Sequence, residues 1–193
     1  MKLTFSISPA TCILLFCMIA TTPLDQFTSC ICAATLHELG HIAAAQLLDI
    51  RLSHMKLDVL GARLSTTGKL YSYIKVAVLC FAGPFINFLF FAVCFPFSSS
   101  FPWLNHFCLA NLSLGALNLI PIDGFDGGRI LYGLLCKIFS LHTAQRISVV
   151  LSFCSLLLLW MLSVWLLLRT GTSLTLFVFS CCLFGMLFVS AKN

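Results

Sequence analysis

Long apolar runs separated by short polar stretches dominate this chain. They predict transmembrane helices at residues 3–20, 27–48, 71–97, 103–120, 147–168 and 172–190. At about 1.5 Å per residue, each run comes close to the roughly 30 Å of a bilayer's hydrocarbon. The first run also fits a signal peptide, but Pro9 and Pro23 favour a bend and a loop there. The pattern predicts an all-α membrane protein of about six spans, with residues 1–193 forming a single domain.

Composition and charge support this interpretation. The chain is 60% hydrophobic and only 9% charged, whereas a soluble domain carries about 25% charged residues. If the N-terminus is cytoplasmic, ten of the 11 lysines and arginines lie inside and only Arg169 lies outside. This asymmetry follows the positive-inside rule and places both termini in the cytoplasm. No basic stripe with interleaved aromatic residues is present, so we expect no nucleic-acid partner.

A histidine pair lies inside the second run. His37, Glu38 and His41 form the pattern HExxH. Histidines four residues apart on a helix face one side, about 6 Å apart along the axis, and can share one metal ion. The glutamate can then act as general base towards a water at the metal. Ionisable groups are costly within a bilayer, so this placement indicates a function. The predicted orientation puts His41 about 10 Å from the cytoplasmic end of its span.

A catalytic zinc site needs a third protein ligand, because the fourth position is kept for water. Asp123 and Asp126 follow the fourth run, where Pro121 and three glycines interrupt the helix. Unwound backbone at membrane depth requires surrounding protein or a wet cavity. We therefore expect a carboxylate from this break to reach the histidines. The residues alone leave both aspartates open, and a simple Asp-Gly turn in a cytoplasmic loop is the alternative.

These motifs together resemble the site-2 protease family of intramembrane zinc metalloproteases. The resemblance rests on HExxH and on the later pattern Asn-x-x-Pro-x-x-x-x-Asp-Gly, which runs from Asn118 to Gly127. Gly83, Pro84 and Asn87 are similar to the family's Gly-Pro-x-x-Asn in the intervening span. The resemblance covers roughly residues 30–135. The layout looks most like the bacterial branch that includes sporulation proteases, without an appended regulatory domain.

The resemblance implies one zinc ion per chain, held by His37, His41 and Asp126. The family's ligand lies eight residues after the asparagine and directly before Gly-Gly, which selects Asp126 over Asp123. Where the family usually has leucine before this aspartate, the chain has Phe125.

The resemblance also implies roles for three further side chains. Glu38 is expected to be the catalytic general base, and Asn118 a donor to the developing oxyanion. A polar contact between helices is the alternative for Asn118. Asn87 is expected to pack the bundle or to orient a partner.

The connection between the second and third runs alternates polar and apolar side chains over a few residues, from Met55 to Val59. This alternation is compatible with a short strand, and the resemblance implies a membrane-surface β-hairpin beside the active site. Such a strand could bind an unwound substrate by strand addition. An irregular basic loop touching anionic lipid is the alternative.

The expected function is hydrolysis of a peptide bond in or near a transmembrane segment of a membrane-protein substrate, which releases a cytoplasmic fragment. The expected location is the bacterial cytoplasmic membrane, with the lipid bilayer and regulatory membrane proteins as further partners. A non-catalytic zinc protein that binds transmembrane segments is the alternative, and the presence of Glu38 argues against it. A zinc transporter would need polar residues through both leaflets, but the outer halves of the runs are almost wholly apolar.

Overall fold

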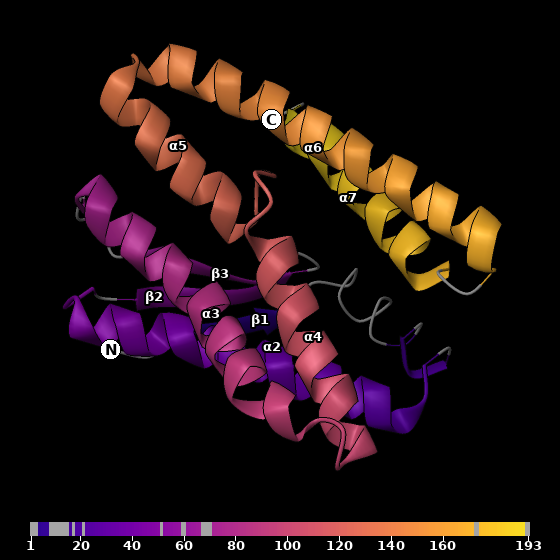
Figure 1. The fold of residues 1–193 in the computed structure, drawn as a ribbon. Coiled ribbons are helices and arrows are strands. Elements are labelled where there is room, and N and C mark those ends of the chain that lie inside the picture. The colour runs from indigo at the N-terminus through magenta and orange to yellow at the C-terminus, as the bar shows by residue number, and fades with distance from the viewer. Residues whose placement is uncertain are drawn as a thin grey trace.

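The computed structural model describes residues 4–7, 16, 18–20, 22–50, 52–58, 61–66, 71–171 and 174–191, with the strands and both ends of the last helix described by backbone alone. Helices dominate the fold (Figure 1). α2 (Leu24–Leu47), α3 (Tyr73–Cys94) and α4 (Pro102–Asn118) contact one another, and α5 (Asp126–Ile138) packs on α3. α6 (Leu141–Thr170) pairs with α7 (Leu174–Ala191) and contacts α5. A 3-10 turn, Phe95–Phe97, extends α3.

Two helices in the described part of the chain are long and apolar enough to cross a membrane: residues 73–97 and α6. Only 28% of the most apolar stretch of each is buried within the protein, whereas a soluble core helix would be mostly buried. Their exposed side chains are therefore suited to lipid, which indicates an integral membrane protein. The residue ranges of α2, α4 and α7 overlap with the second, fourth and sixth predicted spans. That each of these three helices crosses the bilayer stays a prediction.

Three features differ from the elements predicted by hydropathy. Thr4–Ile7 form strand β1, so a helix starting at residue 3 is wrong for these four residues; most of the rest of that run lies outside the described residues. α5 lies between the fourth and fifth predicted spans, where no helix was predicted. α6 begins six residues before the predicted span, because the Ser140 hydroxyl caps it by accepting a hydrogen bond from the Thr143 amide.

One small sheet accompanies the helices, in the order β1-β2-β3. β2 (Leu52–Asp58) pairs antiparallel with β3 (Gly61–Thr66), with Asp58 opposite Gly61. β1 adds to the other edge of β2 in parallel, so β2 is the central strand. The backbone thus pairs antiparallel where a hairpin was expected, and the position of these strands relative to a membrane surface stays a prediction.

Small residues let α2 and α3 approach closely. Ala33, Gly40 and Ala44 belong to the buried face of α2. A Cβ at Gly40 would lie 2.8 Å from the Ala82 carbonyl oxygen of α3, so only glycine permits this crossing. Small residues at helix contacts are typical of membrane bundles, where close van der Waals packing replaces the hydrophobic effect. This crossing brings the buried face of α3 directly against the histidines of α2.

Candidate metal centre

The two histidines of HExxH lie one turn apart on the buried face of α2. His37 and His41 are only 4% and 5% exposed. Their rings are arranged edge to face, with 4.8 Å between the ring centroids. Glu38 is half-buried beside them. The helical spacing therefore delivers both imidazoles to one point, as the sequence predicted.

Asp126 completes a compact triangle with these imidazoles. One of its carboxylate oxygens, Oδ2, lies 3.1 Å from Nε2 of His37 and 3.1 Å from Nε2 of His41. The two Nε2 atoms are themselves 3.1 Å apart. Asp123 instead is exposed, and its backbone N–H donates to the Ser152 hydroxyl. The structure thus brings Asp126 to the histidines and leaves Asp123 at the surface.

The break after α4 positions Asp126 by burying two apolar neighbours. Ile122 and Phe125 are 2% and 3% exposed, and they pack in a cluster with Leu156, Leu159 and Leu183 of α6 and α7. Gly124 turns the chain between them with φ +99°, a conformation that favours glycine. Sequence reasoning missed this anchoring by α6 and α7, although two large apolar residues within an Asp-Gly loop were a signal for it.

Two glycines after Asp126 are required by the same packing. A Cβ at Gly127 would collide with the Leu119 carbonyl, and one at Gly128 with the Ile122 carbonyl. The start of α5 therefore lies directly against the unwound backbone that precedes it. Any larger residue would push Asp126 away from the histidines, which gives the Gly-Gly that follows the aspartate a physical reason.

The histidine tautomers are fixed by acceptors on the far side of each ring. Nδ1 of His41 lies 2.8 Å from the Leu79 carbonyl oxygen, and Nδ1 of His37 lies 2.6 Å from Oδ1 of Asn87. Oxygens of this kind only accept, so each neutral ring carries its proton on Nδ1. Both Nε2 atoms then present lone pairs to each other and to a carboxylate. In these neutral tautomers the three acceptor atoms are suited to hold one cation between them.

Gly83 of α3 keeps the space beside the imidazoles open. A Cβ at this position would lie 2.5 Å from Nε2 of His41 and 2.7 Å from Nε2 of His37. Two imidazoles and one carboxylate form a donor set of catalytic zinc, which keeps a further position for water or substrate. The donor set, the tautomers and the open space therefore fit a zinc ion.

Asn118 is the last residue of α4 and is half-buried. Its Nδ2 donates to the Leu114 carbonyl of its own helix, at 3.1 Å. This contact restrains the side chain at the point where the helix ends. Its role as an oxyanion donor stays a prediction.

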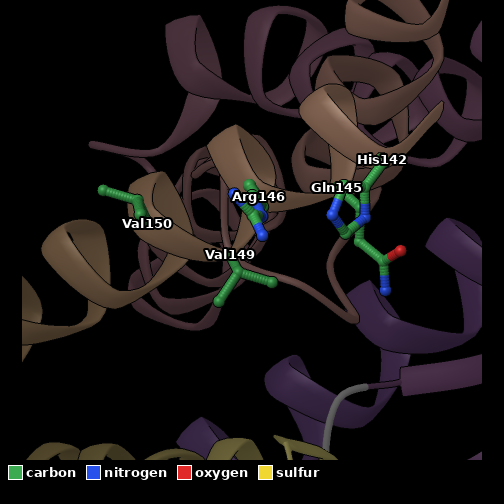
Figure 2. Close-up of a pocket in the computed structure, with 5 residues that line it drawn as sticks. All are labelled: His142, Gln145, Arg146, Val149 and Val150. Carbon is green, nitrogen blue, oxygen red and sulfur yellow. The ribbon is translucent and has the colours of Figure 1, made fainter. Parts of the chain in front are cut away.

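A separate open pocket of about 460 Å³ lies along α6 (Figure 2). Its lining residues are exposed and project from that one helix: His142, Gln145, Arg146, Val149 and Val150. None of them belongs to the cluster of His37, His41 and Asp126, which is the one group of potential metal ligands in the part of the chain that the structure describes. The chemistry of the chain therefore centres on that cluster.

Comparisons with known proteins agree with this geometry. Residues 98–162, which include Asp126, match the profile of Peptidase family M50. A zinc metalloprotease of Methanocaldococcus jannaschii is 29% identical over 129 residues, which is 60% of this chain and 36% of that protein. The chain thus spans about a third of the length of this curated relative. The site-2 protease structure from the same organism superposes with a TM-score of 0.63 at 23% identity, covering 88% of this chain and 83% of that one.

The structural likeness shows the fold. In sequence the chain is similar over residues 98–162 to Peptidase family M50 and over 129 residues to a zinc metalloprotease, and in fold it is similar to a site-2 protease.

Proposed function

We propose that this chain is an intramembrane zinc metalloprotease, which hydrolyses a peptide bond in or near a transmembrane segment of a membrane-protein substrate. The observation that carries the proposal is the triangle of His37, His41 and Asp126, whose ligand atoms all lie within 4.8 Å of one another. The triangle is buried among helices whose outer faces are apolar. A hydrolytic site in this setting is suited to a substrate that is itself in the membrane.

Each side chain of the site has a role in this reaction. His37, His41 and Asp126 would hold a zinc ion, which would supply Lewis-acid chemistry towards water and the scissile carbonyl. Glu38, next to His37 on α2, takes the proton of the attacking water and passes it to the leaving amide nitrogen. Asn118 donates a hydrogen bond to the developing oxyanion once substrate draws its amide away from Leu114.

The substrate must present an unwound segment, because a regular helix engages its carbonyls in its own hydrogen bonds. The asymmetric charge distribution supports a site nearer the cytoplasm, from which cleavage would release a cytoplasmic fragment. The antiparallel pair of β2 and β3 supports a further step, in which the sheet holds the unwound segment by strand addition. The protein would then act in the bacterial cytoplasmic membrane, with regulation supplied by partner membrane proteins or by the substrate.

Co-expression with a panel of single-span membrane proteins tests this function. Wild type is compared with Glu38→Gln, which removes the base while keeping the size of the side chain. We expect cleavage to disappear in the variant while one zinc ion per chain remains bound. Cleavage retained by Glu38→Gln would overturn the assignment of the base. Zinc binding without cleavage of any substrate would favour the alternative of a non-catalytic protein that binds transmembrane segments.

A further inference from the structure

Two asparagines, both fully buried, connect the metal centre to a helix that contributes no ligand to it. Asn87 of α3 and Asn111 of α4 are each 0% exposed. Uncharged polar side chains in an apolar bundle lose their contacts with water, and this loss is offset only when every polar atom is paired. Each polar atom of these two side chains should therefore have a hydrogen-bond partner.

The hydrogen bonds begin at a backbone carbonyl and end at a zinc ligand. Nδ2 of Asn111 donates to the Phe107 carbonyl at 2.9 Å. Nδ2 of Asn87 donates to Oδ1 of Asn111 at 2.9 Å and to the Ala33 carbonyl at 3.1 Å. Oδ1 of Asn87 then lies 2.6 Å from Nδ1 of His37. Three helices thus contribute to one continuous series of contacts.

The direction of this series is set by its carbonyl ends, which can only accept. The Phe107 carbonyl requires the NH₂ group of Asn111, so the oxygen of that amide faces Asn87. The Ala33 carbonyl and this oxygen accept hydrogen bonds from both N–H groups of the Asn87 amide. Only Oδ1 of Asn87 then faces His37, so it must accept a hydrogen bond from Nδ1–H. A reversed Asn87 amide would place N–H against Nδ1, so the proton of His37 would move to the atom that must bind zinc.

We propose that Asn111 is a positioning residue for the metal centre, which acts through Asn87 to fix the His37 tautomer that leaves Nε2 free for zinc. The proposal rests on the metal site of the proposed function and adds a residue with no direct contact to that site. A simple adhesive role between α3 and α4 would need only the contact between the two asparagines. The 2.6 Å contact to His37 is shorter than an ordinary N–H···O hydrogen bond of about 2.9 Å, and it ties the pair to the ligand.

His41 obtains the same tautomer in a simpler way, directly from the Leu79 backbone carbonyl. The two ligands therefore differ in how they respond to substitution. Side-chain changes at Asn87 or Asn111 should affect His37 and leave the tautomer of His41 in place. This difference gives the experiment an internal reference.

The test measures the tautomer and zinc affinity separately, on the full chain in detergent. Imidazole ¹⁵N shifts of the metal-free protein report which nitrogen of His37 carries the proton, with the signal assigned by its loss in His37→Gln. Competition with a chelator gives the zinc affinity. Asn111→Leu removes the acceptor for Asn87 while keeping a side chain of similar size. Ser163→Ala is the control, because it removes a buried hydrogen bond between α6 and α7 that does not involve the metal centre.

In Asn111→Leu we expect a mixture of His37 tautomers with His41 unchanged, and zinc affinity reduced about tenfold, at the lower end of the range for partners of metal-bound histidines. Ser163→Ala should retain the wild-type tautomer and affinity. A wild-type tautomer and affinity in Asn111→Leu would overturn the proposal. Equal losses in Ser163→Ala would also overturn it, because the effect would then not be specific to the contact between the two asparagines. If wild type binds no zinc, the proposed function fails, while the tautomer of the metal-free protein still tests the role of Asn111.

Discussion

Gly83 offers a sharp perturbation of the metal centre, because it touches the site without contributing a ligand. Gly83→Ala adds one methyl group at 2.5 Å from Nε2 of His41 and 2.7 Å from Nε2 of His37. Non-bonded heavy atoms prefer separations of about 3.5–4.0 Å. The methyl group must therefore retreat from both imidazoles by roughly 1 Å. The methyl group is attached to the backbone of α3, which is held against α2 at Gly40. The imidazoles must therefore move instead.

The size of the effect follows from the cost of such overpacking. Extra methyl groups in a packed interior typically cost about 1–3 kcal/mol. If this cost falls on the ligated arrangement, zinc affinity decreases by about 5- to 150-fold, since about 1.4 kcal/mol corresponds to a factor of ten. A methyl group in the space kept for water or substrate should reduce cleavage further. We therefore expect Gly83→Ala to lose activity even at zinc concentrations that restore the metal.

The assay is zinc affinity by chelator competition, followed by cleavage at saturating zinc. Gly185→Ala is the matched control, because among the described residues a Cβ there meets no atom within 4 Å. Wild-type zinc affinity together with wild-type cleavage in Gly83→Ala would refute the description of the site. A loss of the same size in Gly185→Ala would show that the effect is not specific to the site.

Two further predictions address the third ligand and the sheet. Asp126→Ala should weaken zinc binding by more than roughly 100-fold, the upper end of the range for residues that hydrogen-bond to metal ligands, whereas Asp123→Ala should keep one zinc per chain. Metal analysis of the two purified variants distinguishes them. Full zinc retention in Asp126→Ala would reject Asp126 as a ligand. Prolines at alternate positions from residue 51 to 59 should reduce cleavage without changing zinc content, because β2 is the central strand and each proline removes a donor from its backbone. Unchanged cleavage throughout this series would argue against a substrate-binding role for the sheet.

Local patterns were sufficient for the parts of the site that depend on periodicity. The four-residue spacing of His37 and His41 predicts their shared face on any helix, and it holds in α2. The break after Asn118 was also predictable, because proline and several glycines oppose a regular helix. The choice between Asp123 and Asp126 was different. It followed from the family resemblance, and the structure now gives it a cause in the burial of Ile122 and Phe125.

Features that depend on contacts between distant segments were not predicted. β1 exists through pairing with a strand about 50 residues later in the chain, which a short apolar segment does not reveal. The start of α5 is rich in glycine, which hides a helix whose apolar residues nevertheless recur at Ile130, Leu134 and Ile138. Asn111 gave no signal by itself, because its significance arises only where α4 meets Asn87.

In the proposed function, the site formed by His37, His41 and Asp126 hydrolyses peptide bonds within the membrane. The most direct measurement is cleavage of a single-span substrate by purified protein in liposomes, with the cut position mapped by mass spectrometry. We predict one zinc-dependent cut in or near the transmembrane segment, absent with Glu38→Gln and after zinc removal. A zinc-loaded wild-type protein that leaves every tested segment intact, or a cut that persists in Glu38→Gln, would contradict the claim.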